Sequence, residues 1–486
     1  MANAFETWGK KYGLILGILV GLVIWFYPVP PAITVTQHKL LAIFGGAVIL
    51  WITIGVNFAV SSIITTCLLY FWVGNLTGQV KDGVLVRSTD FALSQFAGAS
   101  LWLLVTGFVI SIAMTKTGVA KRLSLHMIRL LGRTPFGAIM AASLTNYLVA
   151  PVTPANTART AAMLPIIQGI AAAYDAVPGK SNFGRAIALS AAFGGNITGS
   201  AFLTGTIANP AALSAVIAAV GTSAYTSWSF WALASAPTNF VILFITAWLL
   251  LKLFPPEVKE IPGGISYVAQ ELKTMGPMSW PEKRAILYFL IALGLWATDR
   301  LHGLNATMIA FLVSALIYFP RIGVLDWRES QNQLPWELFM YFGGVLTLGD
   351  ALMKSKAIEF VIKGALSSLG LQAIPETTLL FLLIGFTIFS HIVWSTTTAM
   401  AGVMLPIYVG IAQAMGFDVA RFCLPLCIMI GYALFLPFNT MGNIIFLGTG
   451  FYTVSEQLKA SLILGAIIWG LWIITALTWW KIIGLT

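Results

Sequence analysis

Apolar segments long enough to cross a lipid bilayer recur along the whole chain. A crossing helix needs about 20 mostly apolar residues, and 58% of the residues are hydrophobic while 9% are charged. Because only helices and closed barrels satisfy their backbone groups inside lipid, the sequence predicts an all-α polytopic membrane protein with about eleven transmembrane helices. The candidate segments are residues 13–27, 38–54, 57–73, 99–115, 185–220, 228–252, 285–299, 305–320, 335–352, 420–446 and 458–480.

Basic residues gather in segments that would lie on one side of these helices. The first apolar segment follows Lys10 and Lys11 and ends in Pro-Val-Pro-Pro without a small-residue cleavage pattern, so we expect a retained helix. Because cytoplasmic loops are enriched in Lys and Arg, we predict a cytoplasmic N-terminus in a multi-pass protein of the cell membrane, the inner or plasma membrane of a bacterium. The net charge of +10 then reflects orientation in the bilayer and indicates no nucleic-acid partner.

Three further segments differ in composition from the predicted membrane helices. Residues 116–133 and, more weakly, 353–374 mix charged and apolar residues at helical spacing, which is typical of amphipathic helices in the membrane interface. Residues 255–284 form the longest hydrophilic stretch, which we predict to be a cytoplasmic loop. It is too short for a separate soluble domain. The lipid bilayer is therefore the expected partner of the whole chain.

Two regions of ambiguous pattern, 134–184 and 375–415, are related to each other. The segment ANTARTAAMLPI (155–166) aligns without a gap with TTTAMAGVMLPI (396–407), and TGTIAN (204–209) aligns with FNTMGN (438–443). Two matches in the same order, at offsets of 241 and 234 residues, indicate a duplication. Five predicted helices lie between the two regions, so two re-entrant hairpins there would enter from opposite faces. We therefore expect an inverted repeat, as in secondary transporters whose substrate site lies where the repeats meet.

Proline and glycine are placed to break the helices of both repeats. Pro151, Pro154 and Pro165 are predicted to interrupt the first hairpin and Pro406 the second, while the stretches 194–210 and 436–443 interrupt the helices that follow. Such breaks leave backbone groups that lipid cannot satisfy. They are tolerated around a wet cavity or a ligand.

Polar side chains follow the break in each hairpin. Asn156 and Thr157 in the first repeat, and Thr396, Thr397 and Thr398 in the second, precede helical segments and should lie near helix N-termini, where an anion is favoured. Two such loops related by pseudo-symmetry would form facing pockets that suit a small dicarboxylate. The alternative is that these groups only bond their own helical turn or a neighbouring helix.

Arg159 and His391 are the candidate positive charges of the two hairpins. A guanidinium inside the bilayer costs about 2.5 to 3.5 kcal/mol even on lenient insertion scales. Arg159 must therefore either reach the interface or compensate an anionic substrate, and we favour the second role. His391, four residues before Ser395, would act likewise when protonated, with a neutral packing histidine as the alternative.

Several functional classes lack their residues in this sequence. None of the four polar loops carries Asp or Glu, so coupling through a membrane carboxylate is not expected. There is no HExxH motif, no Ser/His/Asp set in the loops and no glycine-rich nucleotide loop, so we predict no enzyme, no cofactor and no metal site. A passive anion channel remains an alternative.

The stretch PVTPANTART (151–160) resembles the signature of the first hairpin in the divalent anion/sodium symporter family. Its Arg-bearing form is similar to the exchanger branch, bacterial citrate/succinate antiporters and plastid 2-oxoglutarate/malate translocators, as is the segment 269–279. The resemblance extends over essentially the whole chain. It implies an elevator-type transporter that works as a homodimer.

The resemblance also implies a division of the chain and a set of site residues. A scaffold (1–115 and 285–352) would support a transport part with one repeat in 134–254 and the other in 375–486. The implied substrate-binding residues are Asn156, Thr157, Gly205, Thr206, Thr396, Thr397, Thr398, Asn439 and Thr440.

The chain departs from the sodium-coupled pattern of that family. Ala155 stands where those members have Ser, Thr396-Thr397 replaces Ser-Asn, and Arg159 would repel a nearby cation. An empty carrier with an unpaired buried charge would cross only at high cost, whereas cargo would neutralise it. The hypothesis is exchange of C4 and C5 dicarboxylates of the succinate, malate and 2-oxoglutarate type, with citrate as a further candidate; the alternative is a sodium-coupled symporter of the same substrates.

Overall fold

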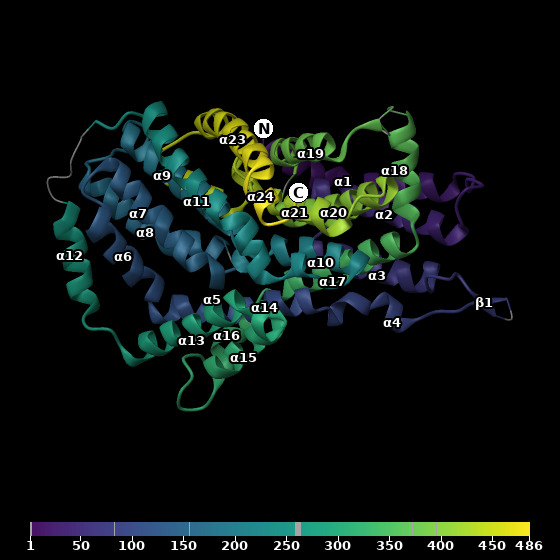
Figure 1. The fold of residues 1–486 in the computed structure, drawn as a ribbon, viewed down its shortest axis with the longest axis horizontal. Helices are drawn as coiled ribbons and strands as arrows, with labels where there is room; N and C mark the ends of the chain where they lie inside the picture. The colour runs from purple at the N-terminus through teal and green to yellow at the C-terminus, as the bar shows by residue number, and fades with distance from the viewer. Residues whose placement is uncertain are drawn as a thin grey trace.

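The chain folds into a helical assembly (Figure 1), seen in a computed structural model that describes residues 2–81, 83–154, 156–257, 264–368, 370, 373–394 and 396–486. The helices of the first half are α1 (Ala2–Phe26), α2 (Val35–Thr53), α3 (Phe58–Leu68, extended by a π-helical turn Leu69–Val73), α4 (Thr89–Ala92), α5 (Ala99–Thr117), α6 (Val119–Leu131), α7 (Pro135–Val149), α8 (Asn156–Ala173), α9 (Asn182–Ser200), α10 (Ala208–Val220) and α11 (Trp228–Leu253). Those of the second half are α12 (Gly264–Met275), α13 (Trp280–Ala297), α14 (Asp299–His302), α15 (Ala306–Tyr318), α16 (Trp327–Ser330), α17 (Trp336–Lys354), α18 (Ala357–Ser368), α19 (Glu376–Ser390), α20 (Thr397–Met415), α21 (Val419–Met429), α22 (Met441–Leu447), α23 (Val454–Leu477) and α24 (Trp479–Ile482).

The prediction of an all-α chain needs one small correction. Between α3 and α4, β1 (Val80–Lys81) pairs with β2 (Val84–Leu85) as an antiparallel ribbon. Gly83 in its turn has a φ of +75°, a left-handed conformation that glycine adopts without strain. A ribbon of this size lies outside the apolar segments, so hydropathy gave no sign of it.

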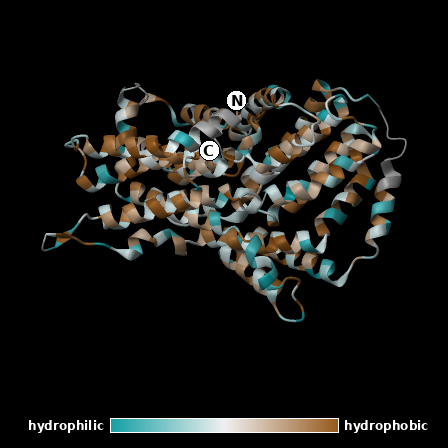
Figure 2. Ribbon diagram, turned by 180° about the vertical axis from the view of Figure 1, so that it is seen from behind, coloured by the Kyte–Doolittle hydropathy of each residue, from teal (hydrophilic) through white to brown (hydrophobic). Residues whose placement is uncertain are grey.

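Several helices are long and apolar enough to cross a membrane. Among the described residues six meet that length and composition, and six shorter apolar helices accompany them. Each of the eleven predicted segments overlaps at least one helix, but the number that crosses stays a prediction. Hydrophobic residues make up much of the helical ribbon in Figure 2. Large apolar side chains such as Val23 (68% exposed) and Phe26 (78% exposed) lie on the surface. Surfaces of this kind suit lipid, as expected for a multi-pass membrane protein.

The two predicted amphipathic segments form helices, and the segment 255–284, which was predicted to be a loop, is partly helical. Helix α6 lies within 116–133 and α18 within 353–374. The stretch 255–284 contains α12 and the start of α13, which is a correction to the loop prediction. The α13 start is fixed by a capping box of Ser279 and Glu282, and the buried Glu282 carboxylate also pairs with Arg122 of α6 at 2.7 Å.

One order of elements occurs twice along the chain. In the first half, α7 and α8 flank a break, and α9 and α10 flank an unwound stretch before α11; in the second half α19, α20, α21, α22 and α23 repeat that order. The two ambiguous regions are therefore helix–break–helix pairs, as predicted. Pro165 and Pro406, however, lie inside α8 and α20, so the prediction that they break the hairpins is wrong. A proline removes only one helical hydrogen bond, and packed neighbours within a membrane protein compensate for it.

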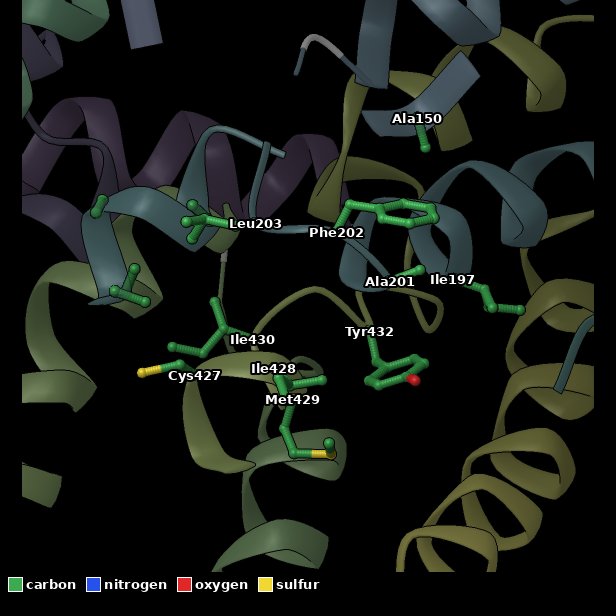
Figure 3. Close-up of a cluster of buried hydrophobic side chains, with 14 of the residues drawn as sticks. Ala150, Ile197, Ala201, Phe202, Leu203, Cys427, Ile428, Met429, Ile430 and Tyr432 are labelled. Carbon is green, nitrogen blue, oxygen red and sulfur yellow. The ribbon is translucent and has the colours of Figure 1, made fainter. Parts of the chain in front are cut away.

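The two halves interlock through their helices. Helix α8 packs against α22 of the second half, and α20 packs against α10 of the first. In Figure 1, α6, α7, α8, α9 and α12 lie at one end of the molecule and α1, α2, α3 and α18 at the other, with α10 and α17 between. Figure 3 shows where the halves meet: Phe202 and Leu203 after α9, and Ile430 and Tyr432 after α21, belong to one cluster of buried side chains.

Candidate functional site

Four helices begin at the breaks that the sequence indicated. Helix α8 begins at Asn156 and α20 at Thr397, whereas α10 and α22 begin at Ala208 and Met441, just after the unwound stretches. Thr396 caps α20 by accepting from the Ala399 N–H at 3.1 Å, and Thr440 caps α22 by accepting from the Asn443 N–H at 3.4 Å. The first-turn N–H groups of such helices attract anions. The expectation that Asn156, Thr157 and residues 396–398 lie near helix N-termini is confirmed.

The predicted site residues differ in how accessible they are. Thr157 is exposed, whereas Gly205 and Asn439 are buried. The remaining predicted substrate-binding residues are half-buried: Asn156, Thr206, Thr396, Thr397, Thr398 and Thr440. Ala155, at which the chain departs from the sodium-coupled pattern, lies outside the described residues.

Arg159 is buried among backbone carbonyls. Its side chain is 3% exposed, so the interfacial alternative is wrong. The Nη1 group donates to the oxygens of Thr153 and Gly205 (2.7 Å for the latter), and Nη2 donates to the Gly195 oxygen at 3.1 Å. No carboxylate among the described residues forms an ion pair with it, and its Nε has no acceptor there. The guanidinium therefore braces the first hairpin against the first unwound stretch, and its charge is not neutralised.

The second repeat makes the same brace with a neutral side chain. Asn439 donates through Nδ2 to the oxygens of His391 and Trp394, both at 2.8 Å. Trp394 stands 241 positions after Thr153, and Asn439 stands 234 positions after Gly205. Hairpin and unwound stretch are thus tied at matching places, but in the second repeat the donor comes from the unwound stretch.

Two asparagines at matching positions hold the unwound stretches in the same way. Asn209 donates to the oxygens of Gly199 and Phe202, at 2.9 and 2.8 Å. Asn443 donates to those of Ala433 and Leu436, at 2.8 and 3.1 Å, and each of these residues lies 234 positions after its counterpart. Sequence reasoning did not select either as a site residue, although both end the aligned segments TGTIAN and FNTMGN. Their shared bonds support the duplication.

A chain of amides joins the first tip to the second unwound stretch. Asn156 donates to Asn196 Oδ1 at 2.9 Å, and Asn196 donates to Asn443 Oδ1 at 3.0 Å. Thr160 also donates to Asn156 Oδ1 at 3.2 Å. A Cβ on Gly195 would lie too close to that same oxygen, so a larger residue there would displace the Asn156 side chain. Asn196 is fully buried, and because it has no polar counterpart in the second repeat, sequence reasoning missed it.

His391 lies in the break of the second hairpin, 0% exposed. Its Nδ1 is 3.0 Å from the oxygens of Thr387 and Ile388, and its Nε2 is 3.0 Å from that of Ile430. A neutral imidazole has one N–H, so only a doubly protonated ring would donate on both sides. Arg159 and His391 are therefore alike in facing carbonyl oxygens.

The two tips are not joined directly. Among the described residues, no hydrogen bond links Asn156 or Thr157 to Thr396, Thr397 or Thr398. No cluster of three or more His, Cys, Asp or Glu in the described part of the chain could hold a metal ion. The arrangement thus offers helix N-termini, hydroxyls and one unneutralised guanidinium, which suit an anion.

A cavity of about 620 Å³ adjoins the site without containing it. It lies between α5, α10, α17 and the connection from α13 to α15, and none of the predicted substrate-binding residues lines it. Leu203 and Pro210 do, on either side of Gly205 and Thr206. Asp350 of α17, a buried carboxylate that sequence reasoning overlooked, lines it as well.

Comparison with known proteins gives a consistent result. The sequence pattern described as "Sodium:sulfate symporter transmembrane region" matches residues 9–486. The chain is 26% identical to a putative malate transporter from Bacillus subtilis, covering 98% of this chain and 97% of the relative. It is also 26% identical to the L-tartrate/succinate antiporter of Escherichia coli, covering 98% and 93%.

A solved structure shares the fold at low sequence identity. The YdaH transporter of Alcanivorax borkumensis superposes with a TM-score of 0.53 at 13% identity, covering 88% of this chain and 99% of that one. The fold is thus that of a polytopic transporter. The chain belongs to the sodium:sulfate symporter family, which is the divalent anion/sodium symporter family that its first hairpin resembles, and it is a membrane transporter rather than an enzyme.

Proposed function

We propose that the protein exchanges C4 and C5 dicarboxylates across the cell membrane as an obligate antiporter. Its relatives are named as a malate transporter and an L-tartrate/succinate antiporter, which supports this substrate class. The observation that carries the exchange mechanism is the buried guanidinium of Arg159, which no carboxylate neutralises among the described residues. An anion bound nearby would supply the missing charge.

The physical argument concerns the empty carrier. Carrying an uncompensated cation through hydrocarbon costs at least about 2.5 to 3.5 kcal/mol. That cost alone slows the crossing by a factor on the order of 100, since 1.4 kcal/mol is tenfold. A dicarboxylate beside Arg159 would remove it. Only loaded carriers would then cross at a useful rate, and uptake would require export.

We assign the binding roles by what each side chain is already bonded to. The amides of Asn156 and Asn439 are engaged by Asn196, Thr160 and the backbone, so we assign them to shaping the loops. Direct contact with the substrate falls to the accessible hydroxyls and to the N–H groups at the helix starts. These residues are Thr157, Thr206, Thr396, Thr397, Thr398 and Thr440. Gly205 would let the backbone approach the anion, and His391 would add a second positive charge when protonated.

The proposed movement is of elevator type. Helices α8, α9, α10, α20, α21 and α22 interlock, as expected for a body that moves as a unit. Helix α17 packs against α10 and α20 and would belong to the stationary scaffold of residues 1–115 and 285–352. Helices α6 and α18 would connect the two parts as interfacial helices. We further propose a homodimer with an inverted repeat in each subunit and a cytoplasmic N-terminus.

Counterflow in proteoliposomes tests this function. Vesicles holding the purified protein are either preloaded with unlabelled succinate or left empty, and uptake of labelled succinate is measured with and without a sodium gradient. We expect uptake only into preloaded vesicles, independent of sodium and with one-for-one stoichiometry. Sodium-dependent uptake into empty vesicles would establish the symport alternative instead. Replacing the internal succinate with malate, 2-oxoglutarate, tartrate or citrate ranks the substrates.

A further inference from the structure

The cavity of about 620 Å³ beside the unwound stretch carries charges that the proposed binding site does not use. Four charged residues line it: Asp299, Arg300, Asp350 and Lys354. Their formal charges sum to zero, so the charge that a solute meets in the cavity depends on which side chains are accessible to it. The two acids and the two cations differ in this respect.

Both acids are buried and already engaged. Asp299 is 6% exposed and accepts from the Ser229 N–H at 3.2 Å and from the Ser229 hydroxyl at 2.5 Å. Asp350 is 5% exposed, and its Oδ2 pairs with Lys354 Nζ at 2.8 Å, while its Oδ1 has no donor among the described residues. Both carboxylates therefore line the cavity while being almost entirely covered by neighbouring groups.

Both cations are accessible. The Lys354 side chain is 52% exposed even though it pairs with Asp350. Arg300 is exposed, forms no ion pair with any described carboxylate, and lies with Cζ 5.0 Å from the centre of the Phe230 ring. A solute in this cavity therefore meets positive charge, and a cleft lined by one accessible sign concentrates the opposite ion.

The cavity lies next to the proposed binding site, so its positive charge would act on an approaching substrate. Leu203 and Pro210 of its wall flank Gly205 and Thr206, so the cavity ends at the first unwound stretch. Its other walls are the start of α5, the end of α10, the end of α17 and the connection from α13 to α15. In the predicted topology, all of these face away from the cytoplasm.

We infer that this cavity is the access chamber for the divalent anion on the non-cytoplasmic face, with Arg300 and Lys354 as collecting residues and Asp350 as the group that restrains Lys354. The inference rests on the proposed function for the identity of the anion. It concerns capture of the substrate before binding, so these residues change the KM from one face and leave the exchange step itself unchanged.

Transport kinetics test the chamber first. In oriented vesicles, Arg300→Gln and Lys354→Gln should each raise the KM for external succinate by about 3- to 10-fold and weaken its dependence on ionic strength, with an unchanged maximal rate. Arg328→Gln, an exposed arginine outside the cavity, is the matched control and should match the wild type. Asp350→Asn should lower the KM, because Lys354 is released; a KM equal to or above the wild-type value would overturn the role given to Asp350.

A labelling experiment reads the field without any substrate. Thr222→Cys places a thiol in the cavity wall, in a background with the exposed Cys67 changed to Ser. The ratio of its reaction rates with an anionic and a cationic methanethiosulfonate should fall at least 3-fold when Arg300 and Lys354 are both changed to Gln. At Thr274→Cys, an exposed position on α12 outside the cavity, the ratio should not change.

The two experiments separate the inference from the proposed function. If the wild type shows no counterflow but the labelling ratio falls, the positive chamber stands and the dicarboxylate exchange fails. If the wild type exchanges succinate while the Arg300 and Lys354 variants keep both the KM and the labelling ratio, the chamber inference is overturned.

Discussion

The two repeats tie hairpin to unwound stretch at matching places, one with a charged side chain and the other with a neutral one. In the first repeat Arg159 reaches from the hairpin to Gly205, and in the second Asn439 reaches from the unwound stretch to Trp394. Met400 occupies the position of Arg159, and Gly205 that of Asn439. Either side chain can close the same loop by donating to carbonyl oxygens.

The difference shows that the charge is not needed for the architecture. A buried amide satisfies two carbonyls at little electrostatic cost, whereas a buried guanidinium without a carboxylate is expensive. The first repeat uses the guanidinium although the second repeat ties the same places with a neutral amide. We infer that Arg159 is retained for what its charge does to cargo and to movement.

The largest effect is expected from Arg159→Met, which copies the residue of the second repeat. Exchange should fall by about 100-fold, or the protein should become a leaky uniporter, because an empty carrier would no longer be held back by a buried charge. Efflux into substrate-free medium separates these two results. Either result would support a role for Arg159 in exchange. If the variant exchanged substrate like the wild type, Arg159 would have no part in the mechanism.

Loss of folding must be distinguished from loss of function in that variant. Three backbone oxygens lose a donor, each at a cost of about 1 to 3 kcal/mol. Arg159→Lys keeps the charge with fewer donors and serves as the control. A monodisperse profile in size-exclusion chromatography, together with leak in the Met variant and none in the Lys variant, would assign the effect to charge.

Asn439→Ala should have a smaller effect of a different kind. The oxygens of His391 and Trp394 lose their donor, which costs about 1 to 3 kcal/mol each and loosens the second hairpin. We expect a lower melting temperature and roughly tenfold slower exchange, but no leak, because no charge is removed. Leak in this variant would contradict the distinction between the charged and the neutral brace.

Asn209 and Asn443, which occupy matching positions, allow a finer comparison of the two repeats, with a smaller expected difference in stability. Asn209→Ala and Asn443→Ala each remove two bonds to backbone oxygens and one side-chain acceptor. The acceptor lost with Asn209 serves the half-buried Thr206 hydroxyl, which water can reach, whereas the one lost with Asn443 serves the buried Asn196 amide. The second variant should therefore be less stable by about 1 kcal/mol, the value of one hydrogen bond. Thermal unfolding of the two proteins in the same detergent measures it. Equal melting temperatures would mean that the amide chain does not join the halves.

A further comparison concerns Gly199, a glycine that has an alanine at the matching position of the second repeat. A Cβ on Gly199 would collide with Thr206 Cγ2, whereas the matching residue of the second repeat is already Ala433. Gly199→Ala should cost about 1 to 3 kcal/mol through overpacking, and Ala433→Gly no more than about 1 kcal/mol. Comparing their melting temperatures with the wild type tests this order. The reverse order would show that the two stretches are packed alike.

Much of the fold was predictable because it depends on local properties of the chain. The length of an apolar segment decides whether a helix forms in lipid, and a run of glycine and polar residues marks where it unwinds, as at 194–210 and 436–443. The starts of α8 and α20 followed from the same pattern. Pro165 and Pro406 misled the prediction because a single proline is tolerated once neighbouring helices pack around it.

The sequence by itself determined the class of protein, the two pairs of matching segments, the breaks before α8 and α20, and the presence of an arginine within an apolar region. Only the tertiary structure decided what those residues touch. Arg159 bonds to Gly205, 46 residues away, Asn196 to Asn443, 247 residues away, and Asp350 meets a cavity built from four parts of the chain. Periodicity and hydropathy describe neighbours along one helix, whereas hydrogen-bond partners and accessible charge depend on which helices pack together.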